Sequence, residues 1–199
     1  MTDVVIGLVA DTHVPDRIKN LHPELMRVFK REEVSQILHA GDVSDQSVLE
    51  ELGTLAPVTA VQGNRDLLRN GNTLPKTVSL NVNGVKVGLM HGFGNMWLYF
   101  VEKFYFLTKG YQLAYYRRLA EKTFPDADVI IFGHTHIPEN VQFDDHLIIN
   151  PGSAGMGGWG YPPSCGILRI ASDGSFRTEI IDLNGAVLKD RRWVETADG

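Results

Sequence analysis

Five short apolar runs in this chain each end in residues that can bind a metal ion. The clearest run covers residues 129–132, and it is followed by Gly133, His134 and, two residues later, His136. A short continuous apolar run is typical of a buried strand, and side chains two residues apart in an extended backbone point to the same side. Both imidazoles are therefore expected to face one point in space. Taken alone, this run also fits a polar loop with two solvated histidines, and the other four runs decide against that alternative.

The first run, residues 4–10, ends in Asp11-Thr12-His13, again with two candidate ligands two residues apart. A carboxylate with an imidazole suits a borderline cation such as manganese, iron or zinc. Asp-x-His is common by chance, and Asp11 alone could simply begin a turn. The remaining three runs, residues 34–40, 58–61 and 85–89, lead to Asp42, Asn64 and His91, respectively.

These polar positions are expected to form one site, because strand ends in α/β folds converge on one edge of the sheet. Four of the seven histidines belong to the set, and a single cysteine excludes a thiolate cluster. Imidazoles, two carboxylates and one amide suit two borderline divalent cations about 3.5–4 Å apart. Asp42 is the natural bridge, since each of its oxygens can hold one ion. Metal binding requires neutral imidazoles, so affinity should fall below about pH 6.

Helix-start signals occur twice in the first third of the chain. A helix is expected to begin at His22-Pro23, with His22 as a cap or surface residue. A second helix is expected from Ser44 or Asp45 to about Leu52.

Turn signals predict hairpins, and two histidines outside the candidate site have structural interpretations. Hairpins are expected at residues 83–84, 144–145 and 173–174. His39 is interpreted as a hydrogen-bonded core residue and His146 as a surface residue. The glycine-rich residues 154–160 predict a mobile loop with an exposed Trp159. The polar tail beyond Lys189 is expected to fray, with Trp193 as an anchor.

An aromatic-rich segment at about residues 95–124 is expected to be helical and bent near Gly110. Nine of the chain's eighteen aromatic residues lie between residues 97 and 116. Their positions go round the helix, so three interpretations stay open: a buried core helix, a contact in a homo-oligomer, and a cap beside the active site. Glu102 and Lys103 argue against a membrane span.

Charge and length limit the function classes. The formal net charge of −5 argues against a generic nucleic-acid binder, which leaves nucleic acid only as a small nucleotide substrate. No basic leader and no run long enough for a bilayer are apparent, so we expect a cytoplasmic protein without a membrane partner. A length of 199 residues fits one domain over residues 1–199.

Six ordered motifs together resemble those of the calcineurin-like metallophosphoesterases, in particular the small single-domain bacterial and archaeal phosphodiesterases. The resemblance covers nearly the whole chain and implies an α/β (α+β) fold, a four-layer αββα sandwich of two mixed β-sheets flanked by helices. The motifs are Asp11-x-His13, Gly41-Asp42, Gly63-Asn64-x-Asp66, His91-Gly92, Gly133-His134-x-His136 and Asn150-Pro151-Gly152-Ser153.

The resemblance also implies a function and a cofactor. The expected activity is a dinuclear-metal-dependent phosphodiesterase, in which a metal-bound hydroxide attacks the phosphorus of a small-molecule phosphate ester. Two divalent metal ions are implied, with manganese favoured and iron, zinc, nickel or cobalt as alternatives. By resemblance, Asp11, His13 and His136 would hold one metal, Asn64, His91 and His134 the second, and Asp42 would bridge. The implied catalytic residues are Asp42, Asn64, Arg65, Asp66 and His91, of which Asn64, Arg65 and His91 would bind substrate.

Arg65 departs from the family pattern, which has a histidine or sometimes a cysteine at this position. A guanidinium cannot act as a general acid, because its pKa lies above about 12. It can clamp a phosphate oxygen, so esters with good leaving groups, such as aryl phosphodiesters, are expected to be preferred. Asp66 is expected to orient Arg65 or a ligand histidine; the plainer alternative is a surface Arg65 paired with Asp66. The loop around Trp159 replaces a Pro-Arg pair that small relatives carry.

Two other functions compete with the diesterase. The first is a non-catalytic or weakly catalytic protein-interaction scaffold of the same fold, like the retromer subunit. A scaffold tolerates loss of ligand residues, whereas all seven ligand types are present here. Hydrolysis of phosphoproteins is disfavoured, because a chain this short has little room for lobes that shape a protein-binding groove.

Overall fold

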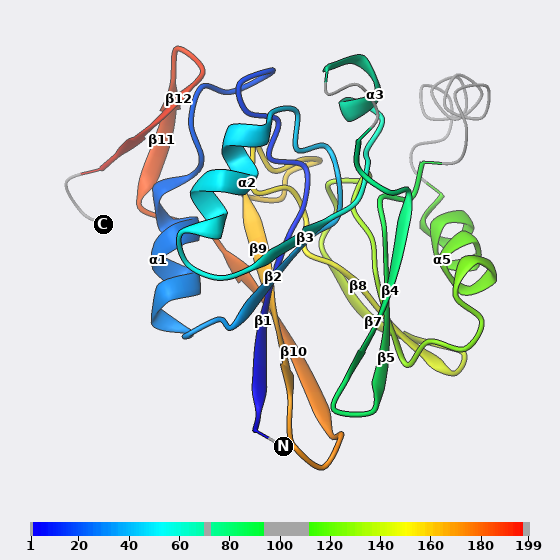
Figure 1. Ribbon diagram of the computed structural model, residues 1–199. Coiled ribbons are helices and arrows are strands. Elements are labelled where there is room, and N and C mark those ends of the chain that lie inside the picture. Colours follow the sequence, from blue (N-terminus) through cyan, green and yellow to red (C-terminus); the bar gives the residue numbers. More distant parts are fainter. Residues whose placement is uncertain (1, 70–72, 94–111, 197–199) are drawn as a thin grey trace.

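Two β-sheets are stacked between outer helices (Figure 1). The computed structural model describes residues 2–69, 73–93 and 112–196. Within these residues the first sheet has the strand order β10-β9-β1-β2-β3. Strands β1, β2 and β3 are parallel, and β9 and β10 continue the sheet in antiparallel pairing. Their bounds are β1 Val4–Val9, β2 Gln36–His39, β3 Val58–Ala60, β9 Ser164–Ile170 and β10 Phe176–Asp182.

The second sheet has the order β4-β5-β6-β8-β7. Its three central strands, β5, β6 and β8, are parallel, and β4 and β7 pair antiparallel at the edges. Both sheets are therefore mixed. The bounds are β4 Thr77–Val82, β5 Val85–Met90, β6 Val129–Ile131, β7 Glu139–Phe143 and β8 His146–Asn150.

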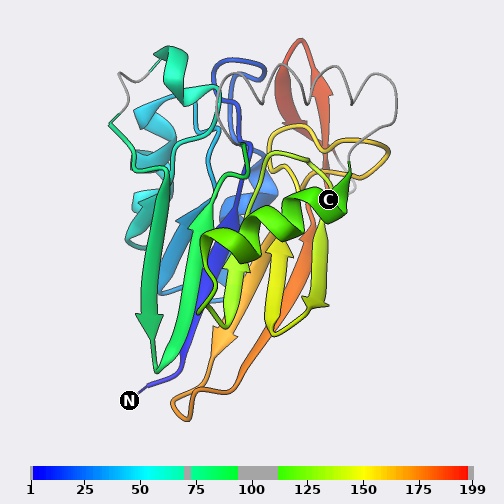
Figure 2. The same ribbon diagram turned by 90° about the vertical axis from the view of Figure 1, so that its right-hand side faces the viewer.

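The side-chain alternation of the central strands sorts the core into layers. In β1, Ile6 and Leu8 pack between the sheets, whereas Val9 packs against the outer helices of the first sheet. In β6, Val129 and Ile131 face the other sheet, whereas Ile130 faces the helix on the outside. The predicted four-layer αββα sandwich is confirmed, and Figure 2 shows the outer helix lying across the second sheet. Helices α1 Pro23–Arg31 and α2 Gln46–Gly53 cover the first sheet, and α5 Leu113–Thr123 covers the second.

The two helix starts follow the cap signals. The N-cap of α1 is His22, whose Nδ1 accepts the backbone N–H of Glu24 at 3.3 Å. Burial lowers the pKa of His22 to about 4, which keeps that nitrogen unprotonated and able to accept. The N-cap of α2 is Asp45, whose carboxylate accepts from the backbone N–H of Ser47 at 3.0 Å. Thus the cap interpretation of His22 is confirmed, although its side chain is buried.

Two expectations about the periphery are wrong. His146 is buried rather than exposed, because its Nδ1 donates to the backbone carbonyl of Ala127 at 2.6 Å. The C-terminal tail does not fray over residues 186–195. It forms a hairpin of β11 Ala186–Lys189 and β12 Arg192–Glu195, in which Trp193 is the expected anchor.

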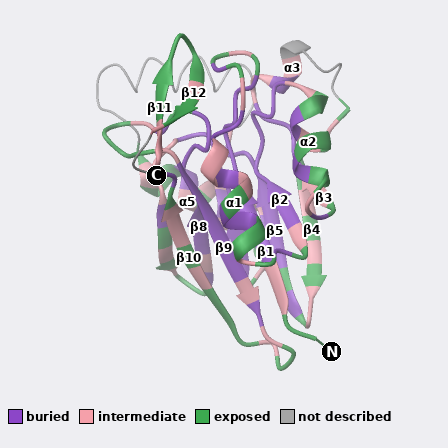
Figure 3. Cartoon of the chain, turned by 90° about the vertical axis from the view of Figure 1, so that its left-hand side faces the viewer, coloured by how far each residue is buried: buried purple, intermediate pink, exposed green. Residues whose placement is uncertain are grey.

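Other expectations about loops and helices have mixed outcomes. The hairpin at Asn83-Gly84 and the exposure of Trp159 are confirmed. Helix α5 forms the C-terminal part of the aromatic-rich segment that was expected to be helical. The expected bend near Gly110 and most aromatic residues of that segment lie outside the described residues. No helix among the described residues is long and apolar enough to cross a membrane. Figure 3 shows that the buried residues concentrate in the strands and in the loops above them.

Candidate metal centre

The candidate ligands gather where five strands end at the same edge of the two sheets. They follow β1, β2, β3, β5 and β6, and each lies in a loop rather than in the strand itself. Five of these non-glycine residues have φ between 52° and 70°, a left-handed conformation that side chains disfavour and that is concentrated at functional sites. These residues are Asp11, His13, Asp42, His134 and His136.

The left-handed turns send His134 and His136 to different neighbours. The Nδ1 atom of His134 lies 3.1 Å from Asn64 Oδ1, and Nε2 of His136 lies 3.3 Å from Asp11 Oδ1. The prediction that both imidazoles face one point is therefore wrong. It assumed an extended backbone, and the chain leaves the extended conformation as soon as β6 ends.

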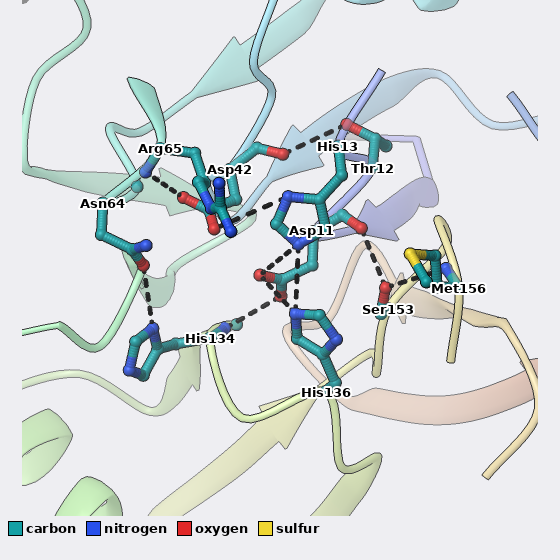
Figure 4. A network of polar contacts seen from close by, with 12 residues as sticks. Asp11, Thr12, His13, Asp42, Asn64, Arg65, His134, His136, Ser153 and Met156 are labelled. Carbon is teal, nitrogen blue, oxygen red and sulfur yellow. Dashed lines mark hydrogen bonds and ion pairs between the residues drawn. The ribbon is translucent and has the colours of Figure 1, made fainter. Parts of the chain in front are cut away.

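The first cluster consists of Asp11, His13 and His136 (Figure 4). The Nε2 atoms of His13 and His136 lie 3.2 Å apart, and Asp11 Oδ1 is 3.9 Å from Nε2 of His13. This carboxylate oxygen is fully buried and accepts no hydrogen bond. A buried acceptor surrounded by imidazole nitrogens is the donor set that a borderline divalent cation takes.

The second cluster consists of Asn64, His91 and His134. Asn64 Oδ1 lies 3.1 Å from Nε2 of His91 and 3.1 Å from Nδ1 of His134. His91 Nδ1 donates to the carbonyl of Ala40 at 2.7 Å, so in the neutral ring Nε2 presents a lone pair. A lone pair that faces an amide oxygen fits a cation between them.

Asp42 and Asp11 each lie within reach of both clusters. Asp42 Oδ1 is 3.5 Å from His91 Nε2, and its Oδ2 is 3.8 Å from His13 Nδ1. Asp11 Oδ1 is also 3.9 Å from His91 Nε2, so Asp11 reaches the second cluster too. The family resemblance had implied that Asp11 belongs to one cluster only.

Burial makes the electrostatics of this centre unfavourable without a cation. Burial, reinforced by the Asp11 charge, raises the pKa of Asp42 to about 7, although the Arg65 backbone N–H partly offsets it. Burial lowers the pKa of His13 to about 3. Burial would also raise the pKa of Asp11, but His136 and the other imidazoles hold it below its ordinary range. Divalent cations would compensate the carboxylate charges that these histidines only partly balance.

Asp66 has a different role from the predicted one. It is buried, and its carboxylate accepts the backbone N–H of Ser44 at 2.7 Å and of Gly63 at 2.7 Å. It therefore ties together the loops that carry Asp42 and Asn64. The expected contacts of its side chain with Arg65 or with a ligand histidine are not among its hydrogen bonds in the described residues.

Arg65 pairs with Asp16, a residue that the sequence analysis did not single out. Its Nη1 lies 3.0 Å from Asp16 Oδ2, while its backbone N–H donates to Asp42 Oδ1 at 2.8 Å. The Arg65 side chain is 31% exposed, so a solute can reach it. No sequence spacing signals this pair, because the two residues come from different loops.

The Asn150-to-Ser153 motif binds the backbone of the loops that carry the candidate ligands. Asn150 Nδ2 donates to the carbonyl of Gly133 at 2.9 Å, next to His134. Ser153 Oγ donates to the carbonyl of Asp11 at 2.9 Å. His39 is buried and lies 3.1 Å from Thr12 Oγ1 through its Nε2, so its interpretation as a hydrogen-bonded core histidine is confirmed.

Gly63→Ala is expected to destroy the centre from the backbone side. A Cβ at residue 63 would lie 2.2 Å from both the backbone nitrogen and Oδ1 of Asp42, so the carboxylate must move or the loop must unfold. We expect more than about 10-fold weaker binding of Mn²⁺ by calorimetry. Gly53→Ala is the matched control, since its Cβ would meet nothing within 4 Å. Unchanged metal binding in Gly63→Ala would contradict the placement of Asp42.

The sequence of the chain matches a known protein family. The sequence profile of the calcineurin-like phosphoesterase superfamily domain matches residues 4–173. The chain belongs to this family. A probable metallophosphoesterase of Methanothermobacter thermautotrophicus is 37% identical over 150 residues, which cover 75% of this chain and 77% of that protein. A phosphodiesterase of Methanocaldococcus jannaschii is 27% identical over 161 residues, which cover 74% of this chain and 82% of that protein.

Solved structures give the same fold. Vacuolar protein sorting 29 of Cryptosporidium parvum superposes with a TM-score of 0.67 at 20% identity, covering 91% of this chain and 98% of that chain. Identity at this level supports the fold alone. The resemblance stated from the motifs is thus confirmed, and this calcineurin-like phosphoesterase carries candidate ligands for the metal that its family requires.

Proposed function

We propose that this protein is a phosphodiesterase that depends on two divalent cations and acts on small-molecule phosphate esters. The observation that carries the proposal is a buried, unsatisfied Asp11 oxygen with imidazole nitrogens of His13, His91 and His136 within 3.3–3.9 Å. The phosphodiesterase relative from Methanocaldococcus jannaschii supports the diester assignment.

The proposed ligand sets follow the two clusters. Asp11, His13 and His136 would hold one cation, and Asn64, His91 and His134 would hold the other. Asp42 would bridge, since its two oxygens face the two clusters. Bound divalent cations of this kind polarise phosphoryl oxygens and supply a nucleophile from water at neutral pH. Manganese is the first ion to test, because imidazole and carboxylate ligands together suit it.

Arg65 is proposed to bind a phosphate oxygen of the substrate. Its partner Asp16 is a carboxylate, and a phosphate oxygen can take the same place on the guanidinium. The pairing is partly exposed, so exchange does not require a buried charge to be stripped of its partner. A guanidinium supplies no proton to the leaving group, so substrates should depart as weakly basic groups such as aryl oxides.

Arg65→Ala is expected to lower kcat/KM for an aryl phosphodiester about 10- to 100-fold, because a charge-assisted hydrogen bond contributes about 1.5–3 kcal/mol. Arg118→Ala is the matched control, since Arg118 also pairs with a carboxylate, Asp144, but lies on the exposed face of α5. Asp16→Asn should leave activity intact or lower KM by removing the competing carboxylate. An unchanged kcat/KM in Arg65→Ala would assign Arg65 to a surface ion pair.

The substrate class is tested by comparing two nitrophenyl esters. We expect the Mn²⁺-loaded protein to hydrolyse bis-p-nitrophenyl phosphate faster than p-nitrophenyl phosphate at equal concentration. Faster release from the monoester would replace the diesterase with a phosphatase. Two bound ions with turnover of neither ester would instead favour the scaffold function, which the likeness to vacuolar protein sorting 29 supports only at the level of the fold.

A further inference from the structure

The C-terminal hairpin, β11 and β12, lies outside the residues that match the family domain, yet it packs beside the metal centre. The match ends at residue 173, and the hairpin covers residues 186–195. Figures 1 and 2 show it above the first sheet, next to the loop that follows β1. The hairpin therefore lies beyond the matched residues and still contacts the loop that carries Asp11 and His13 and the glycine-rich loop.

Hydrogen bonds dock the hairpin onto the loop between β1 and α1. The backbone N–H of Lys19 donates to the carbonyl of Arg191 at 2.7 Å, and Arg191 Nε donates to the carbonyl of Arg17 at 2.8 Å. Asn20 binds the backbone of Trp193 on both sides, accepting its N–H at 3.0 Å and donating to its carbonyl at 3.2 Å. These bonds hold Trp193 in one place relative to the loop.

The indole of Trp193 then reaches the glycine-rich loop. Its ring lies 4.5 Å from the imidazole ring of His22, and its Nε1 donates to the carbonyl of Gly155 at 2.8 Å. Gly155 lies directly against the first ligand loop, since its own N–H donates to the carbonyl of Asp11 at 3.2 Å. A Cβ at Gly155 would lie 2.6 Å from the carbonyl oxygens of Asp11 and Thr12, so the approach requires glycine.

The same glycine-rich loop fixes the ring of a proposed ligand. The carbonyl of Gly157 accepts from Nδ1 of His136 at 3.3 Å. A carbonyl can only accept, so this bond places a proton on Nδ1 and keeps Nε2 as the nitrogen that faces Asp11 and His13 and that would bind a cation. The bond orients the ring as well, as carbonyl partners of metal-binding histidines commonly do.

We infer that Trp193 is a positioning residue for His136. The docked hairpin fixes the position of Trp193, and its indole N–H binds the carbonyl of Gly155. Two residues later in the same loop, the carbonyl of Gly157 accepts from Nδ1 of His136 and so orients its ring and favours one tautomer. The role in metal binding rests on the proposed function, whereas the role in setting the tautomer does not. Loss of the indole N–H should release the loop, populate the other His136 tautomer and weaken the first metal cluster more than the second.

Trp193→Phe tests this inference, because it keeps an aromatic ring against His22 and removes the donor. Val194→Thr is the matched control, a near-isosteric change at an exposed position on the same strand. The first readout is ¹⁵N NMR of the metal-free protein with labelled histidine, which reports the protonated nitrogen of His136. The second is stepwise Mn²⁺ titration by calorimetry.

We expect Trp193→Phe to raise the Nε2-protonated population of His136 and to weaken one of the two Mn²⁺ steps about 10-fold, with the other step unchanged. The control should match the wild type in both readouts. Wild-type tautomer and affinities in Trp193→Phe would overturn the inference. If the wild type binds no Mn²⁺, the proposed function fails, and the tautomer readout still tests the positioning role.

A second variant covers the case in which Trp193→Phe does not fold. Asn20→Ala removes both bonds to the Trp193 backbone and leaves the indole in place. It should shift the His136 tautomer in the same direction. An unshifted tautomer in folded Asn20→Ala would overturn the inference.

Discussion

Asp42→Asn is expected to abolish phosphodiester turnover and at the same time to stabilise the metal-free protein. Asp42 is buried, and its folded-state pKa of about 7 lies above the unfolded value of 3.8. Between these two values the carboxyl is protonated in the folded protein and ionised in the unfolded chain, so stability falls as pH rises from about 3.8 to about 7, and the full loss is present above pH 7. Asparagine carries no charge, so the metal-free variant should gain stability relative to the wild type at pH 8 and much less at pH 5.

A variant that loses turnover and gains stability has lost a metal ligand, whereas loss of a structural residue would lower both. Loss of the bridging carboxylate should lower turnover more than about 100-fold, because even partners outside the ligand set typically contribute 10- to 100-fold. Thermal unfolding of the metal-free protein at pH 5 and pH 8, with turnover measured in Mn²⁺, gives both numbers. Asp126→Asn removes an exposed carboxylate and should change neither. Full turnover in Asp42→Asn, or a lower melting temperature at pH 8, would contradict the assignment.

Mn²⁺ is expected to raise the melting temperature by about 5–10 °C at a hundredfold excess over its dissociation constant. Saturation of this kind stabilises a folded protein by about 2.7 kcal/mol, and 1 kcal/mol corresponds to about 2–4 °C for a domain of this size. The residue set is rich in imidazole, which Ca²⁺ binds poorly, so Ca²⁺ at the same concentration should give a much smaller rise.

The pH dependence of this rise has a definite sign. Burial would lower the pKa of His136, but the Asp11 carboxylate more than compensates and the net pKa is raised above 6.5. Binding of Mn²⁺ must displace that proton, so the stabilisation should shrink as pH falls through a value above 6.5. Calorimetric melting curves from pH 8.5 to pH 5.5, with and without Mn²⁺, measure it. A rise that is independent of pH, or equal for Ca²⁺, would argue against imidazole ligation.

The buried strands could be predicted from the sequence because they are short apolar runs. Residues 4–10 and 129–132 are continuous runs because both faces of β1 and β6 are covered, one by the other sheet and one by helices. The hairpin at Asn83-Gly84 was equally clear, since both residues have the positive φ that this turn requires.

The identity of the candidate ligands could be read from the strand ends, but their grouping could not. His134 and His136 are separated by one residue and yet reach different clusters, because left-handed backbone at both positions turns the chain. An argument from extended-strand alternation has no access to those angles. Only the family resemblance predicted the division into two clusters.

Contacts between loops that are distant in the chain could not be predicted from the sequence either. Asp66 binds the backbone of residues 43, 44 and 63, and backbone amides leave no pattern in the side chains. His146 is buried because its ring meets the Ala127 carbonyl across 19 residues of chain, although it lies next to a polar hairpin turn. The C-terminal hairpin was missed because each of its strands has only four residues, most of them exposed, so no buried apolar run marks it.

The most direct test is turnover of bis-p-nitrophenyl phosphate by metal-stripped protein, before and after addition of Mn²⁺, with bound metal counted in the same sample. We predict no turnover in the stripped protein, and turnover that rises as occupancy approaches about two ions per chain. Turnover that persists without metal, or that saturates with one ion bound, would contradict a dinuclear metal centre.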